Sequence, residues 1–200
     1  MISINVKSNI DQVIRDLQAK IPRVVEQAQV SALNKTADGA KTRMVRAISA
    51  TYKIDQRTVR ERLFIARASR KNGATFSASL IGSGKRSMNV IHFLEKKVTL
   101  AEGKRRRKGG TLTQLRFEIK RGKKVTIAGQ FGHGAFIGND GRTVFERRGK
   151  SRLPIEPVQT INIPGMFNSR KNIGEVQAWI NENFPRIFRH ELAYYMGRTK

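Results

Sequence analysis

Cysteine is absent from this chain of 200 residues, which excludes disulfides, thiolate metal ligands, iron–sulfur clusters and a cysteine nucleophile. Aromatic residues make up only 7% of the sequence. No apolar run approaches the ~20 residues that a membrane span needs, and no basic region followed by an apolar stretch opens the chain as in a secretory signal. We therefore expect it to be made and used in a cytoplasm, or in a particle assembled there. Because 38% of the residues are hydrophobic and none is cysteine, we expect a folded protein held together by packing alone.

Acidic residues are also scarce, numbering 15 against 40 Lys and Arg, so the formal net charge is +25. The excess is spread along the chain, since residues 1–100 carry 19 basic and 7 acidic residues and residues 101–200 carry 21 and 8. Two stretches are more concentrated: 41–71 has 10 basic and 2 acidic residues, and 104–124 has 10 and 1. Such a surface favours a polyanion or an acidic protein as its partner.

Four segments have apolar residues at steps of three and four, the spacing of one helix face. They are about 10–21, Pro22 to Ser49, 55–64 and Asn172 to Met196. The second is rich in alanine, which predicts close approach to a neighbouring element. The third opens with an N-cap candidate, Asp55. Pro185 interrupts the fourth, but the apolar stripe keeps its phase, which favours a kink over a break.

Between these helices the apolar period shifts toward two and glycines mark turns, which predicts strands. The predicted strands are 64–68, 74–81, 89–94, 114–120, 123–128, 142–147 and 158–163. Arg121-Gly122 is predicted as a hairpin turn, and Asn139-Asp140-Gly141 as another. Residues 101–110, AEGKRRRKGG, have the composition of a loop.

This order predicts an α+β fold with long N-terminal helices, a central antiparallel β-sheet block and a kinked C-terminal helix packed on the sheet. We expect a single domain over 1–200. Its predicted parts are a helical part (1–64), a β part (65–165) that includes the basic loop 101–110, and the C-terminal helix (172–196).

No motif in the sequence indicates catalysis, a cofactor or a metal. Gly82-Ser-Gly84-Lys85 resembles a P-loop only superficially, because Ser79 and Arg86 stand where that motif needs Gly and Ser or Thr. The glycine-rich stretch 129–138 lacks the dinucleotide-binding spacing. The three histidines lie far apart and the carboxylates are scattered, so metal-dependent nuclease chemistry has no visible ligand set. We therefore expect no enzyme, no cofactor and no small-molecule substrate.

The strongest functional features are the basic loop and the basic hairpin. Their cations are Lys104, Arg105, Arg106, Arg107, Lys108, Lys120, Arg121, Lys123 and Lys124. Contact with DNA through them would be steeply salt-dependent. Sequence-specific readout is not expected, because no helix-turn-helix, zinc-finger or RNA-binding aromatic motif occurs. The alternatives are docking on an acidic protein and a loop that only adds solubility.

Short motifs between about residues 25 and 165 are similar, in kind and order, to those of a known family. They are Ala32-Leu33-Asn34-Lys35-Thr36, Thr42-Arg43, Tyr52-Lys53-Ile54, Val59-Arg60-Glu61-Arg62, a central polybasic loop, Gly134-Ala135-Phe136-Ile137, Gly141-Arg142, Leu153-Pro154-Ile155-Glu156-Pro157-Val158 and Pro164. In these motifs the chain resembles the minor tail protein Z, or tail completion, proteins of long-tailed phages.

The resemblance implies a non-enzymatic virion component in the tail or neck, assembled in the host cytoplasm. It would complete the tail at its head-proximal end, as a homo-oligomeric, hexameric ring around the DNA channel, and support head–tail joining and genome positioning. Its partners would be tail tube, tail terminator and head–tail connector proteins and the phage genomic DNA, with no membrane. The family has no catalytic residues to carry over, and its motifs suggest Gly134 and Pro154 as backbone-geometry positions.

Two other functional classes fit parts of the same sequence. A non-sequence-specific nucleic-acid-binding or packaging protein would share the even charge and the lack of catalysis, but would act as a monomer or dimer. A nuclease or recombinase would need a metal-binding carboxylate pair, which the sequence does not show.

Overall fold

The computed structural model describes residues 21–69, 76–84, 87–95, 101, 115–127, 135–149 and 151–198. The chain forms two compact units. The first contains Met1–Ala47, Gln56–Ser83 and Phe167–Lys200, and the second contains Ile48–Asp55 and Gly84–Met166. The single domain predicted over the whole chain stays a prediction, because one domain can contain more than one compact unit.

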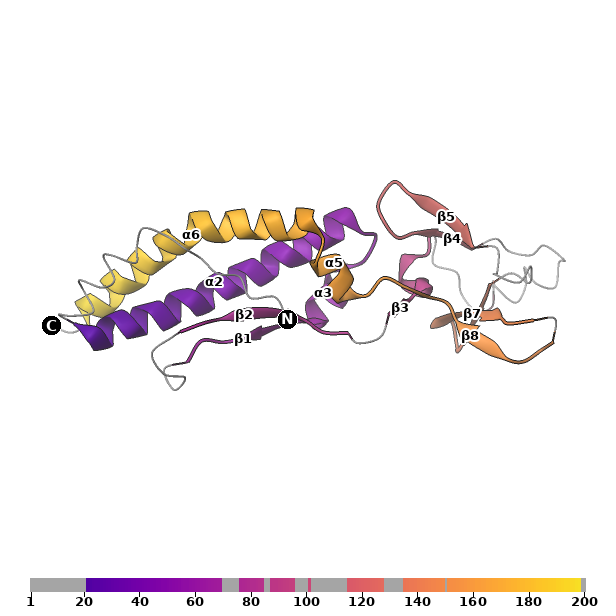
Figure 1. Cartoon of the computed structure of the whole chain (residues 1–200), viewed down its shortest axis with the longest axis horizontal. Helices are drawn as coiled ribbons and strands as arrows, with labels where there is room; N and C mark the ends of the chain where they lie inside the picture. The colour runs from indigo at the N-terminus through magenta and orange to yellow at the C-terminus, as the bar shows by residue number, and fades with distance from the viewer. Residues whose placement is uncertain are drawn as a thin grey trace. The chain divides into compact units, whose positions relative to one another are not determined.

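Two long helices dominate the first unit, α2 (Pro22–Thr51) and α6 (Arg170–Gly197), as Figure 1 shows. Their pairing is antiparallel, because Lys35 contacts Glu191 whereas Arg43, farther along α2, contacts Glu175. Ala28 and Ala32 of α2 are fully buried in one cluster with Phe188 of α6. The alanine-rich stripe therefore does mark a close approach, and the partner is the C-terminal helix.

Gly39 of α2 lies against the ring of Trp179 of α6. A Cβ added there would lie 2.1 Å from Cη2 of Trp179, far inside van der Waals contact. From the sequence Gly39 appears only as a weak point of the helix, since glycine costs about 1 kcal/mol relative to alanine. Its role is to leave room for the indole ring.

Helix α6 runs without interruption through Pro185, so the prediction of a kink rather than a break is confirmed. Figure 1 shows its axis changing direction part way along. Proline removes one backbone hydrogen bond and crowds the preceding turn, which is the usual cause of such a bend.

The first unit is completed by α3 (Gln56–Glu61) and the antiparallel pair β1 (Leu63–Ala66) and β2 (Ser79–Gly82). Asn34 of α2 ties the end of β1 to the helix. Its amide donates to the Ala68 carbonyl (3.1 Å) and its Oδ1 accepts from the Ala68 N–H (2.9 Å). This contact satisfies both backbone groups of Ala68.

The second unit contains three small antiparallel sheets among the described residues. One pairs β3 (Met88–Asn89) with β9 (Gln159–Thr160), and another pairs β4 (Leu115–Glu118) with β5 (Lys124–Ile127). The third has the order β6 (Phe136–Gly138), β7 (Thr143–Arg147) and β8 (Ile155–Pro157). The α+β class is confirmed, with the strands distributed over several small sheets instead of one block.

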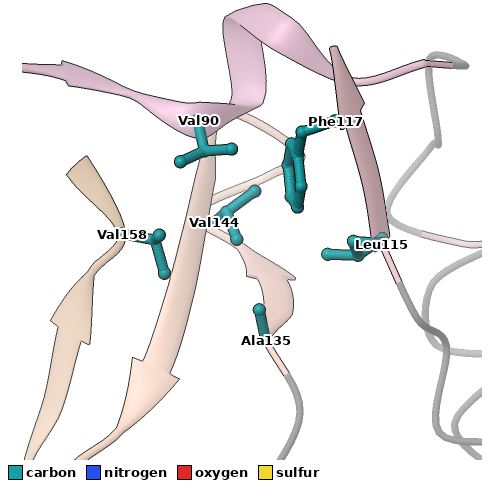
Figure 2. Packing of buried hydrophobic residues seen from close by; sticks show 6 residues of the cluster. All are labelled: Val90, Leu115, Phe117, Ala135, Val144 and Val158. Carbon is teal, nitrogen blue, oxygen red and sulfur yellow. The ribbon is translucent and has the colours of Figure 1, made fainter. Parts of the chain in front are cut away.

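One apolar cluster joins these sheets. Figure 2 shows its side chains pointing toward one another from several strands and from the short 3₁₀ helix η2 (Val90–Phe93). The cluster consists of Val90, Leu115, Phe117, Ala135, Val144 and Val158. Its members lie up to 68 positions apart in sequence, so the core forms only when the whole unit is assembled.

The strand predicted over 89–94 is wrong beyond Asn89, where the chain turns into η2. The Asn89 side chain explains the change. Its Oδ1 accepts from the N–H groups of Ile91 (3.0 Å) and Val144 (2.9 Å), and its Nδ2 donates to the Val144 carbonyl (3.0 Å). Local bonding of this kind lets asparagine end a strand.

The strand predicted over 158–163 is likewise shorter, because β9 ends at Thr160 and α5 (Ile163–Phe167) follows. Asn162 caps this helix, its Oδ1 accepting from the Gly165 N–H at 2.8 Å. Pro164 occupies the first turn, where proline is tolerated. The sequence prediction also missed β6 and β8, which have three residues each. Residues 10–20 of the helix predicted over 10–21 lie outside the described residues, and Ile21 precedes α2.

Candidate functional site

The structure describes part of the predicted basic surface. Residues 104–108 and Gly134 lie outside the described residues. Pro154 immediately precedes β8, and its bond to Leu153 is cis. The predicted hairpin cations, Lys120, Arg121, Lys123 and Lys124, all lie at the exposed turn between β4 and β5.

The predicted hairpin turn is confirmed. The Lys123 N–H donates to the Lys120 carbonyl at 3.0 Å, and Gly122 has φ +81°, a conformation that side chains other than glycine rarely adopt. The turn at 139–142 is confirmed as well, because Arg142 N–H donates to Asn139 O at 3.0 Å. There Asp140 and Gly141 both have positive φ, the pattern of a type I′ turn.

The basic hairpin is attached to the last turn of α2, which belongs to the same unit. Arg121 donates its backbone N–H to the Thr51 carbonyl (3.0 Å) and its Nε to the Ser49 carbonyl (2.9 Å). The Lys53 N–H donates to Ile119 O at 3.0 Å. Because the last carbonyls of a helix have no partner within it and carry partial negative charge, a guanidinium there stabilises the helix end and fixes the hairpin.

Lys124 forms an ion pair with Glu95 on the hairpin face that carries Arg116 and Glu118. Its Nζ lies 2.7 Å from Glu95 Oε1. The hydrogen bond from Lys124 lowers the pKa of Glu95, and the same bond raises the pKa of Lys124. This cation therefore neutralises a carboxylate of its own chain.

Glu118 forms the second ion pair of that face. Its Oε1 accepts from the Gly122 N–H (2.8 Å), and its Oε2 lies 3.2 Å from Nζ of Lys53. The bond from the Gly122 N–H, followed by that from Lys53, lowers the pKa of Glu118. Lys53 also donates to the Glu95 carbonyl at 3.0 Å, so the two pairs form one network.

Lys120 and Lys123 differ from Arg121 and Lys124. Both are exposed, and neither side chain has a hydrogen bond or ion pair among the residues that the structure describes. Arg116 of β4, which the sequence reasoning missed, is exposed on the same strand face as Glu118. Strand alternation could have found it, since residues two apart in a strand share a face.

A different acidic centre lies between α2 and α6 in the first unit. Glu191 is 3% exposed, and its carboxylate accepts from Ser31 Oγ (2.6 Å) and Lys35 Nζ (2.6 Å), with His190 Nδ1 at 3.0 Å. Burial raises the pKa of Glu191, but the hydrogen bonds from Lys35, Ser31 and His190 outweigh it and lower the pKa to about 2. The contacts from Ser31 and Lys35 of α2 join the two helices, whereas His190 lies beside Glu191 on α6.

The described part of the chain contains no group of three or more His, Cys, Asp or Glu side chains placed to hold a metal ion. Within that same part, none of the helices combines the length and the apolarity required to cross a membrane. The geometry instead presents a hairpin anchored to α2, with two lysines at its turn whose side chains have no hydrogen bond or ion pair to the residues that the structure describes.

Comparison with protein families gives a match. The family model described as prophage minor tail protein Z (GPZ) matches residues 7–199. Neither the curated proteins nor the solved structures gave a match. The family match covers nearly the whole chain and includes both compact units.

Proposed function

The chain belongs to the prophage minor tail protein Z family, and from this we propose that it completes the phage tail at its head-proximal end. Membership makes it a structural protein of the phage tail, a virion component that interacts with other tail proteins. The finer role is our proposal. A ring of copies, six in the simplest case, surrounds the DNA channel, supports head–tail joining and positions the genome end without enzymatic activity.

The observation that carries this proposal is the family match, and the exposed hairpin adds a surface for it. Lys120 and Lys123 are held at the end of a hairpin fixed to α2 by Arg121. Together with the basic segment 104–108, they face DNA or acidic tail subunits. Gly134 and Pro154 serve backbone geometry. The neighbouring proteins are the tail tube, the tail terminator and the head–tail connector, and assembly takes place in the host cytoplasm.

Replacement of cations in the assembled phage tests this role. Lys104, Arg105, Arg106, Arg107 and Lys108 changed together to Gln or Ser should leave the fold intact and reduce the fraction of tails joined to heads. The measurement is infectivity together with counting of free tails by electron microscopy. Arg170→Gln with Arg189→Gln removes exposed charge outside both concentrated basic stretches and serves as the control. Wild-type infectivity of the loop variant would overturn this assignment.

The second candidate is a nucleic-acid-packaging protein without sequence preference, favoured by the net charge of +25. Light scattering coupled to size exclusion, over a salt series and with and without duplex DNA, separates the two. A discrete ring-sized species, raised by salt that screens the charge repulsion, supports the tail role. A monomer that binds DNA and never forms a ring supports packaging.

A further inference from the structure

We propose that the basic hairpin divides its work: Lys120 and Lys123 contact the phosphate backbone of duplex DNA, whereas Arg121 and Lys124 only position them. This inference rests on the proposed function, because it names the partner and the contacting side chains of the same surface. It chooses DNA over an acidic tail subunit.

The division follows from the partners of each cation. Arg121 holds the hairpin on the end of α2 through the Ser49 and Thr51 carbonyls. Lys124 neutralises Glu95 at 2.7 Å. A lysine that already pairs with a carboxylate gains little from a phosphate, because it would have to leave one anion to meet another. Lys120 and Lys123 have no such partner among the described residues.

The turn has dimensions suited to a nucleic-acid strand. Lys120 and Lys123 are its first and last residues, joined by the Lys123 N–H to Lys120 O bond, so their Cα atoms lie within about 7 Å of each other. One strand of duplex DNA presents a phosphate about every 3.4 Å of helix axis. Two flexible lysine side chains can therefore reach neighbouring phosphates of one strand.

The chemistry of the turn favours DNA over a protein. Residues 120–124 are all exposed and include no apolar or aromatic side chain. Stable protein interfaces are centred on buried aromatic or aliphatic anchors, which this turn lacks. Phosphate contacts need only cations and carry no sequence information. Val125, the next residue, is apolar and exposed. It pairs with the buried Phe117, so its side chain lies on the other face of the hairpin from that of Lys124.

The test is the salt dependence of binding to a fluorescent duplex of arbitrary sequence, measured by anisotropy with the full-length protein. Each phosphate contact contributes about −0.9 to the slope of log K against log salt. Lys120→Gln with Lys123→Gln should therefore make the slope less steep by about 1.8 between roughly 50 and 200 mM salt. Arg170→Gln with Arg189→Gln, which removes two exposed charges outside both concentrated basic stretches, should change it far less. Lys124→Gln should change the slope by less than half as much as Lys123→Gln alone.

The outcomes separate this inference from the proposed function. An unchanged slope in the Lys120 and Lys123 variant, with circular dichroism showing an intact fold, would overturn the inference. The same holds if Lys124→Gln alone lowers the slope by a full phosphate contact. If the variant loses head–tail joining but keeps its slope, an acidic tail subunit is the partner and only the inference fails. If the slope falls while virions assemble normally, DNA contact stands and the proposed role of this surface fails.

Discussion

Glu191 in the first unit and Glu95 in the second both pair with a lysine, but in contrasting surroundings. The Glu191 side chain is 3% exposed between two helices, whereas that of Glu95 is 25% exposed on the face of a hairpin. A buried carboxylate is shielded from dissolved ions, and an exposed pair is readily screened by them. The few acidic residues of this chain therefore have two structural roles. Glu191 joins two helices in the first unit, and Glu95 holds a basic side chain in place in the second.

The first and largest test removes the buried charge. Glu191→Gln keeps the shape of the side chain but loses the ionised acceptor of Ser31 and Lys35. Because the pKa of Glu191 is about 2 in the folded chain and its ordinary value is 4.5, ionisation stabilises the fold by about 3 kcal/mol above pH 4.5. That contribution disappears as the pH falls from about 4.5 toward 2. Urea unfolding at pH 7 and at pH 3 measures it.

Glu175→Gln is the matched control for that change. Glu175 lies on the same helix, but its side chain and that of its partner Arg43 are each 43% exposed. Its loss should matter little, as for most surface pairs. Equal losses of stability from the two variants at pH 7 would show that the buried Glu191 contributes no more to the fold than the exposed Glu175.

The second test concerns the close contact of the helices. Gly39→Ala places a methyl group 2.1 Å from Cη2 of Trp179, so the indole must move. We expect a net loss of about 2 kcal/mol, since crowding outweighs the gain of about 1 kcal/mol in helix propensity. Gly174→Ala in α6 has nothing within 4 Å of the new Cβ and should raise the stability. Thermal unfolding of both variants shows whether Gly39→Ala lowers the stability and Gly174→Ala raises it.

The third test concerns the second unit, where the uncharged side chain of Asn89 bonds the backbone of Val144. Asn89→Ala removes two acceptor contacts and one donor contact, leaving the backbone of Val144 without these partners. A loss of about 1.5 kcal/mol is expected for such half-buried groups. Asn181→Ala is the control, because Asn181 is exposed and its side chain accepts a hydrogen bond from Gln177 of the same helix. Equal losses from the two changes would show that Asn89 does not hold the unit together.

The smallest effect is expected from Lys124→Gln. The Lys124–Glu95 pair is exposed, so its removal should lower stability slightly at low salt and not at all in high salt. Unfolding at two salt concentrations measures this difference. If the loss of stability persists in high salt, the Lys124–Glu95 pair is shielded from salt as the Lys35–Glu191 pair is, and the two ion pairs do not differ as described.

The long elements were predictable from sequence because their signals are local. The apolar stripe from Pro22 onward and that from Asn172 onward match α2 and α6, and Arg121-Gly122 marks the hairpin turn. What was missed depends on distant partners. Asn89 ends its strand because its side chain bonds Val144, 55 positions away. No local sequence pattern predicts that contact.

The candidate site divides in the same way. Charge alone identified the hairpin cations, since clustered lysine and arginine are visible in any sequence. It could not tell which of them were already engaged. Lys124 meets Glu95 across 29 positions and Arg121 meets Ser49 across 72, so their pairing depends on the fold. Only the structure shows that the side chains of Lys120 and Lys123 have no partner among the residues it describes.

The joining of α2 to α6 has a consequence for the order in which the protein forms during synthesis. Ser31 and Glu191 are separated by 160 positions. At about 5–20 residues per second, the ribosome needs roughly 8–30 s to make that interval. Throughout it, the alanine face of α2 has no α6 to cover it and must avoid other apolar surfaces. A helix made early is thus buried late, and a host chaperone has its best opportunity to act in that interval.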